Sequence, residues 1–183
     1  MTLQTTPLAD IHNPALTQSL QHKLNNKTKP LGSLGRLEAL ALQLGQILDS
    51  ENPALDQPQM VVFAADHGLA ARGVSAFPSD VTWQMVENFL AGGAAVSVLA
   101  RQHGLALTVV DCGVQRDFLA GLPAGATRPG LQVRKVAGAE GGTADSSAGA
   151  AMAPAQCRQA IANGRALVQG LPGNTLILGE MGI

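Results

Sequence analysis

Short apolar runs alternate with segments of helical periodicity along residues 60–183, and this alternation limits the possible folds more than any other feature. Each run is a predicted strand, and the runs occupy residues 60–65, 105–110, 131–136 and 175–178. Such continuous apolar strands are typical of a parallel sheet that helices cover on both faces. The sequence therefore predicts an α/β fold with a parallel sheet between two layers of helices.

Two helices are predicted between these strands. The first covers residues 79–102, with Ser79 as its N-cap, and the glycine pair at 92–93 loosens its middle. The second covers residues 154–169. Residues 138–149 consist mainly of Gly, Ala and Ser, and we expect them to form a mobile loop.

The N-terminal residues have a different pattern. Asn13-Pro14 provides an N-cap followed by proline at the first helical position, which predicts a helix to about residue 24. Apolar residues then recur at helical spacing over residues 34–48. We therefore predict a small helical domain at residues 1–55 and an α/β domain at residues 56–183.

Composition and charge exclude several classes of protein. The formal net charge of the 183 residues is −1, whereas a nucleic-acid-binding surface needs a basic patch. No uncharged run of about 18 apolar residues is present, so no membrane-spanning helix is expected, and residues 1–10 lack the pattern of a signal peptide. Two cysteines are too few for the disulfide framework of a secreted domain. We expect a cytoplasmic protein without nucleic-acid or membrane partners.

Three predicted strands are followed by an acidic residue close to glycine, namely Asp66, Asp111 and Glu180. Ligands of open parallel sheets bind outside the carboxyl ends of the strands, so these acids form a candidate ligand-facing edge. A structural alternative remains open, in which Asp66 and Asp111 cap the helices or turns that follow them. His67 has no second His or Cys at the spacing of a metal site, and we interpret it as a structural histidine.

Three further segments have both a functional and a plain interpretation. Residues 142–147 could form a phosphate-binding nest, but the lysine of a P-loop is absent and a flexible loop is the preferred interpretation. Lys29 and Arg36 could hold a phosphate or bridge to the other domain, or they could be solvated residues at a helix start. Glu180 lies between glycines, which allows a ligand to approach the backbone closely.

Six stretches of the chain together resemble one family, the nicotinate-nucleotide–dimethylbenzimidazole phosphoribosyltransferases of cobalamin biosynthesis. The stretches are residues 27–38 (KTKPLGSLGRLE), 64–68 (AADHG), 73–78 (GVSAFP), 81–86 (VTWQMV), 88–95 (NFLAGGAA) and 179–182 (GEMG). They occur in the order and spacing of the family. The resemblance extends from about residue 10 to the last residue.

The resemblance implies an activity and an architecture. The family transfers ribose 5-phosphate from nicotinate mononucleotide to 5,6-dimethylbenzimidazole, which gives α-ribazole 5′-phosphate and nicotinate without a metal or other cofactor. Such a displacement needs a pocket for a flat apolar base, donors for the phosphate and a carboxylate that accepts the proton of the base. The family is homodimeric, with a Rossmann-like large domain and a small helical domain built from both chain ends.

Six residues are implied to bind the substrates. Phe77, Pro78, Met85 and Met181 are expected to line the benzimidazole pocket, with Gly182 beside them and Glu180 at the sugar-phosphate end. Some members have Ser in place of Phe77 and Gln in place of Met85, so the pocket of this chain is more apolar. The alternative is that Phe77 and Met85 are ordinary core residues.

The length of the chain departs from the family. Members are about twice as long, and the resemblance places their catalytic glutamate and later phosphate loops beyond Ile183. The last predicted strand also lacks the crossover helix that a parallel strand needs. We therefore expect an incomplete fold and an inactive fragment. The alternatives are a non-catalytic module that binds a nucleotide or benzimidazole, and a scaffold half that folds with a second chain.

Overall fold

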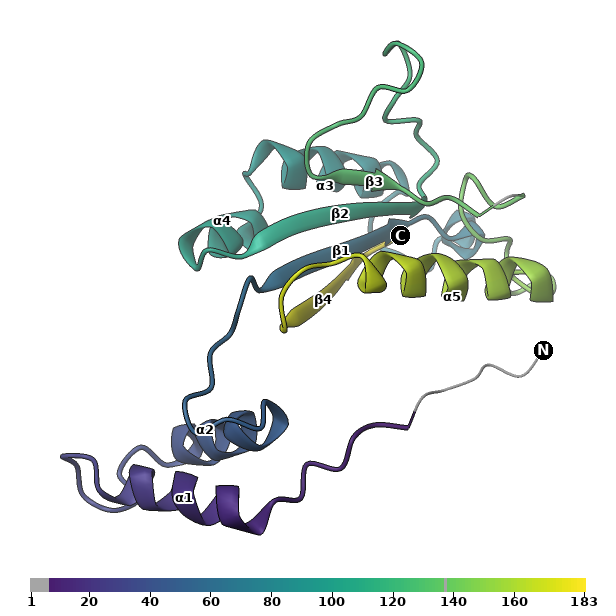
Figure 1. Ribbon diagram of the computed structural model, residues 1–183. Helices are drawn as coiled ribbons and strands as arrows, with labels where there is room; N and C mark the ends of the chain where they lie inside the picture. Colours follow the sequence, from purple (N-terminus) through teal and green to yellow (C-terminus); the bar gives the residue numbers. More distant parts are fainter. Residues whose placement is uncertain (1–6, 137) are drawn as a thin grey trace. The chain divides into compact units, whose positions relative to one another are not determined.

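The computed structural model describes residues 7–136 and 138–183 (Figure 1). The chain divides into two compact units, Met1–Ala54 and Leu55–Ile183. The first unit contains only helices among its described residues, and the second contains the sheet. Within the described ranges, no helix is both long enough and apolar enough to cross a bilayer.

The helical unit is built from α1 (Pro14–Asn25) and α2 (Arg36–Ile47). The side chain of Asn13 accepts a hydrogen bond from the backbone N–H of Leu16 at 3.1 Å, so the predicted N-cap is confirmed. The helices pack closely at Gly45, where an added Cβ would lie 2.5 Å from a methyl carbon of Leu20. A side chain at this position would force the two helices apart.

The basic loop between α1 and α2 contains a nearly buried ion pair. The Lys29 Nζ lies 2.8 Å from the Glu38 Oε1, and the two side chains are 10% and 12% exposed. The hydrogen bond from Lys29 lowers the pKa of Glu38, and the backbone N–H of Leu34 adds a second one. Lys29 therefore fixes the start of α2 through an ion pair, and it is not the solvated residue of the plain interpretation.

The second unit is built on a four-stranded parallel sheet, and the predicted α/β architecture is confirmed. Its strand order is β3-β2-β1-β4. The strands are β1 (Gln59–Ala65), β2 (Ala106–Gly113), β3 (Leu131–Val133) and β4 (Leu176–Met181). The two central strands carry the buried valines, and β4 forms an exposed edge.

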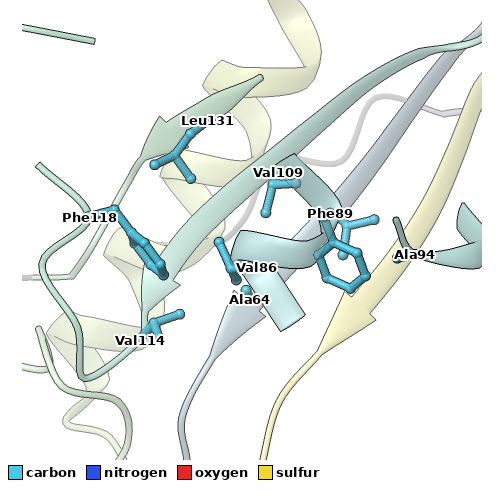
Figure 2. Close-up of a cluster of buried hydrophobic side chains, with 9 residues drawn as sticks. Ala64, Val86, Phe89, Ala94, Val109, Val114, Phe118 and Leu131 are labelled. Atoms are coloured by element: carbon cyan, nitrogen blue, oxygen red, sulfur yellow. The ribbon is translucent and has the colours of Figure 1, made fainter. Parts of the chain in front are cut away.

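Helices cover both faces of this sheet (Figure 1). On one face lie α3 (Asp80–Ala91) and α4 (Ala95–Gln102), and on the other lies α5 (Pro154–Gln169). A short 3₁₀ helix, η1 (Gly68–Arg72), follows β1. The larger core lies on the α3 face, where Val86 and Phe89 pack against Val109 (Figure 2).

The single helix predicted over residues 79–102 is wrong, because the structure has two helices there. Gly92 adopts a left-handed conformation with a φ of 83° and ends α3. This conformation is a common helix stop that glycine adopts without steric cost. Ser79 precedes α3, but its side chain makes no capping hydrogen bond because its backbone is already helical (φ −58°, ψ −26°).

Two strands run further than the sequence predicted. β2 continues through Gly113 and β4 continues through Met181, so Asp111, Glu180 and Met181 belong to strands and not to the turns after them. Pairing with β1 extends both strands, since Ala64 is opposite Asp111 on one side and opposite Met181 on the other. In contrast, β3 stops at Val133, three residues earlier than predicted.

Candidate functional site at the carboxyl ends of the strands

The strand order identifies a switch point between β1 and β4. The connection after β1 runs through α3 and α4 on one face, whereas β4 is reached from α5 on the opposite face. The order of strands therefore reverses between β1 and β4. Such a reversal opens a crevice outside the carboxyl ends of the two strands, which is where ligands of open α/β sheets bind.

Hydrogen bonds join the segments that follow β1 and β4. The backbone N–H of His67 donates to the carbonyl of Ile183 at 3.0 Å, and the N–H of Ile183 donates to the Thr82 hydroxyl at 3.2 Å. A Cβ on Gly182 would lie 2.6 Å from the carbonyl oxygen of Ala65 and 2.9 Å from His67 Nε2. Only glycine fits there, so the close backbone approach at the end of β4 follows from the sequence.

The structure brings two of the predicted base-pocket residues to one core cluster. Met85 on α3 and Met181 on β4 are half-buried and pack against the same core cluster. Phe77 and Pro78 lie just before α3, and Phe77 is 64% exposed. The alternative that Phe77 is a core residue is therefore wrong, whereas Met85 borders the core.

Glu180 is on the other face of β4 from Met181. It lies opposite Phe63 in the sheet, and Phe63 packs on the α5 face with Val61. Met181 lies opposite Ala64, which belongs to the core on the α3 face. Because consecutive strand residues point to opposite faces, the structure separates the exposed Glu180 from Met85 and Met181.

Asp111 has a structural role. Its buried Oδ1 accepts hydrogen bonds from the backbone N–H groups of Gly113 at 3.0 Å and Val114 at 2.8 Å. The Lys135 Nζ lies 3.4 Å from Asp111 Oδ2 and donates to the carbonyls of Val114 and Arg116. Burial raises the pKa of Asp111, and the N–H groups and Lys135 oppose this effect. Asp111 thus stabilises the turn after β2.

Asp66 is also buried and binds the same turn. Its Oδ2 accepts the backbone N–H of Gln115 at 2.7 Å. Its Oδ1 has no hydrogen-bond partner among the described residues. The three acids at the strand ends therefore do not form one cluster of exposed carboxylates, and the turn-stabilising interpretation holds for Asp66 and Asp111.

The glycine-rich loop at residues 138–149 is attached to the segment after β1. The N–H of Thr143 donates to the carbonyl of Asp66 at 3.0 Å, and the N–H of Gly68 donates to the carbonyl of Thr143 at 2.9 Å. An ion pair of 2.6 Å joins Arg72 to Asp145. Several backbone N–H groups that a phosphate nest would need are therefore already engaged within the protein.

His67 is held by this loop. Its Nδ1 lies 3.4 Å from the Thr143 hydroxyl, and its Nε2 lies against Gly182. Among the residues that the structure describes, no three His, Cys, Asp or Glu side chains form a group that could hold a metal ion. The position of His67 agrees with its interpretation as a structural histidine.

The sequence analysis missed two contacts that position α3. The Arg116 guanidinium lies 4.2 Å from the centre of the Trp83 ring, and Arg128 forms hydrogen bonds of 2.8 and 2.7 Å with both oxygens of Glu87. The Arg128 hydrogen bond lowers the pKa of Glu87. These pairs hold the segment after β2 on α3, and no local sequence signal predicts partners so far apart.

Comparisons with known proteins identify the family of this chain. A sequence model of a family described as phosphoribosyltransferase matches residues 10–183. A nicotinate-nucleotide–dimethylbenzimidazole phosphoribosyltransferase from Variovorax paradoxus (strain S110) is 70% identical over 98% of this chain and 49% of the relative. The protein of the same name from Dechloromonas aromatica (strain RCB) is 53% identical over 94% of this chain and 48% of its own length.

A solved structure has the same fold. The crystal structure of the nicotinate-nucleotide–dimethylbenzimidazole phosphoribosyltransferase from Thermus thermophilus superposes with a TM-score of 0.78 at 38% identity, over 94% of this chain and 50% of that one. This chain spans about half the length of the relatives that it matches. The chain belongs to the phosphoribosyltransferase family that includes these enzymes.

Proposed function

We propose that this chain supplies the base-binding part of an enzyme that transfers ribose 5-phosphate from nicotinate mononucleotide to 5,6-dimethylbenzimidazole. The products are nicotinate and α-ribazole 5′-phosphate, the precursor of the lower ligand of cobalamin. The names and identities of the relatives support this reaction. The observation that carries the proposal is that Met85 and Met181 pack on one core cluster while Ile183 is bonded to Thr82 of α3, a short distance along the chain from the exposed Phe77.

The base pocket lies on the α3 side of the crevice in this proposal. Phe77 and Pro78 form one wall, and Met85 and Met181 form the floor where they border the core. A planar bicyclic base gains from contact with an aromatic ring and with polarizable thioethers. Gly182 lets the end of β4 pack directly against Ala65 and His67, which fixes the position of Met181 beside the base.

Glu180 is proposed to lie at the sugar-phosphate end. It is the residue before Met181, on the opposite face of β4, and it is exposed. A ligand that crosses the end of β4 would place its base against Met181 and its sugar near Glu180. Among the described residues, none donates a hydrogen bond to the Glu180 carboxylate, so it is available to a sugar hydroxyl.

A second candidate is a base-binding module that is not catalytic by itself. Asp66 and Asp111 are buried and accept backbone N–H groups, and Glu180 lies on the other face from the base pocket. None of these three carboxylates is held where it could take the proton of a base that contacts Met85. This observation favours binding without turnover for the 183 residues alone.

Two finer features belong to the proposal. We propose a homodimer, and exposed apolar residues of α2 such as Leu37 and Ile47 supply a surface that suits a protein contact. We also propose that the protein acts in the cytoplasm, which agrees with the free thiols of Cys112 and Cys157.

Calorimetric titration of 5,6-dimethylbenzimidazole into the 183-residue chain tests the proposal. We expect saturable binding that Phe77→Ala weakens about tenfold, because an aromatic contact and its buried area are lost. Val168→Ala is the matched control, since Val168 is also exposed, at 42%, but lies on α5 on the other face of the sheet. Equal affinity of the Phe77 variant, or no binding of the base, would overturn the assignment of the pocket.

A further inference from the structure

A second cavity lies on the other face of the sheet, between the strands and α5. It has a volume of about 160 Å³, and its apolar walls include Phe63 of β1, Val110 of β2 and Leu167 of α5. These residues face away from Met85 and Met181, which pack on the α3 side. The cavity is therefore separate from the proposed base pocket.

The cavity exists because α5 carries small residues where it faces the sheet. Ala160, Gly164 and Leu167 are spaced by four and three residues, so they lie on one face of the helix. Only Leu167 is large enough to reach the strands and become buried. A Cβ added to Gly164 would meet no atom within 4 Å. A helix selected only for packing would fill this space.

The rim of the cavity is preformed. Gly142 and Thr143 line it, and the Thr143 N–H is bonded to the carbonyl of Asp66. Gly142 has a φ of 101°, and a side chain there would overlap the Asp66 carbonyl. A wall that is already ordered costs a ligand little conformational entropy on binding.

The lining of the cavity carries positive charge and no negative charge among its described residues. Among the described residues of the wall, Arg134 is the single charged one, and none of them is a carboxylate. The carbonyl of Arg134 accepts a hydrogen bond of 3.0 Å from the Asn163 side chain, which ties its backbone to α5. The wall also contains the thiol of Cys112, and burial together with the nearby Asp111 raises the pKa of this thiol to about 11. One guanidinium nitrogen of Arg134 donates to the carbonyl of Val133 at 3.1 Å, which leaves its other N–H groups for a ligand at the edge of the cavity.

We propose that this cavity binds a small planar aromatic carboxylate, with its ring between Phe63 and Leu167 and its carboxylate on the Arg134 guanidinium. A single aromatic ring suits the volume, because a cavity of similar size in another protein binds benzene. The guanidinium offers paired N–H donors that match a carboxylate. The site goes beyond the proposed function and does not depend on it.

Methyl NMR on methionine-labelled protein locates the ligand. Met152 lines the cavity, whereas Met85 and Met181 lie on the α3 side. We expect benzoate to shift the Met152 methyl signal with a dissociation constant on the order of 1 mM, and to leave Met85 and Met181 unchanged. Shifts at Met85 or Met181 in place of Met152, or no shift at all, would overturn the proposal.

Variants test the charge and the space separately. Benzoate should bind about tenfold more tightly than neutral benzamide. Arg134→Gln should remove that preference. Arg158→Gln should keep it, because Arg158 is on α5 but outside the lining of the cavity. Gly164→Leu should abolish binding of both probes. The proposal fails if benzamide binds as well as benzoate, if Arg158→Gln has the same effect as Arg134→Gln, or if a folded Gly164→Leu protein still binds. If Gly164→Leu does not fold, the Met152 shift in the unsubstituted protein still tests whether the cavity binds benzoate.

Discussion

The two faces of the sheet are packed differently although helices cover both. On the α3 face, nine buried residues among those described form one cluster that extends from Val62 to Leu131 (Figure 2). On the α5 face, the buried cluster consists of Val61, Val110 and Leu167, and a cavity lies beside them. Valines occur on both faces of the central strands, so the difference comes from the helices.

The helices differ in the side chains that they direct at the sheet. α3 contributes Val86 and Phe89, which pack against the strands, although Phe89 also borders a hollow of about 200 Å³ beside α4. α5 contributes Ala160 and Gly164, which leave a cavity against the sheet. The side chains of α3 hold Met85 and Met181 against the core, whereas the small residues of α5 leave room for a ligand. The comparison assigns the proposed benzimidazole pocket to the first face and a separate ligand cavity to the second.

The largest expected effect concerns catalysis. A positioned carboxylate commonly accelerates proton transfer by about 10²–10⁴-fold, and the three acids at the strand ends are not placed beside Met85 and Met181. We expect the 183-residue chain to exchange bases at least about 10²-fold more slowly than the longer relative from Variovorax paradoxus. Chromatography of reactions with nicotinate mononucleotide and 5,6-dimethylbenzimidazole measures the rates. Rates within about tenfold of each other would show that a group in this chain accepts the proton.

The thiol of Cys112 reports whether the cavity is dry. Burial raises its pKa to about 11, so about one molecule in a thousand carries the reactive thiolate at pH 8. We expect alkylation of Cys112 by iodoacetamide to be about 10²-fold slower than that of an unperturbed thiol, and to rise about tenfold per pH unit between about pH 8 and 10. The exposed Cys157 is the internal control in mass spectrometry of tryptic peptides. Equal rates for the two cysteines would mean that water fills the cavity.

Val62 and Val110 form a matched pair across the sheet. Both are buried valines of the central strands, but Val62 lies in the core of the α3 face and Val110 lines the cavity. We expect Val62→Ala to lower the free energy of unfolding by about 2.5 kcal/mol and Val110→Ala by about 1.5 kcal/mol, because Val110 already lacks neighbours on one side. Urea unfolding at equilibrium measures both values. A larger loss of unfolding free energy for Val110→Ala than for the variant on the α3 face would contradict this difference between the two faces.

The exposed edge of the sheet gives the smallest expected effect. Leu178 on β4 is 63% exposed and lies opposite Val61. An apolar edge strand is a template for pairing with another chain, so we expect concentration-dependent self-association. Leu178→Lys should weaken it several-fold, whereas Val74→Lys should not, since Val74 is similarly exposed but lies outside the sheet. Light scattering over a concentration series measures the self-association. The prediction is wrong if both variants associate as strongly as the parent.

Sequence patterns predicted the elements better than their ends. The apolar runs located all four strands, and the proline at position 154 located the start of α5. The break at Gly92 was missed as a helix end, because a glycine pair within a helical pattern does not reveal a left-handed backbone. The extension of β4 through Met181 depends on pairing with β1, which local sequence does not encode.

The candidate site was predictable only in part. Gly182 and Phe77 were expected near a ligand, and the structure places Gly182 against His67 and leaves Phe77 exposed. The opposite orientations of Glu180 and Met181 could not be predicted, because they follow from the position of both residues within β4. The cavity beside α5 was not predicted, because Gly164 in a helix is equally consistent with close packing and with empty space.

Competition between the two ligands tests the central claim that each face has its own site. The dissociation constant of 5,6-dimethylbenzimidazole is measured by calorimetry with and without saturating benzoate, on the same preparation of the chain. Because Met85 and Met181 lie on one side of the sheet and Arg134 and Met152 line the cavity on the other, we expect the constant to change by less than about twofold. A constant that rises in proportion to the benzoate concentration would mean that both ligands share one site, and would contradict the account.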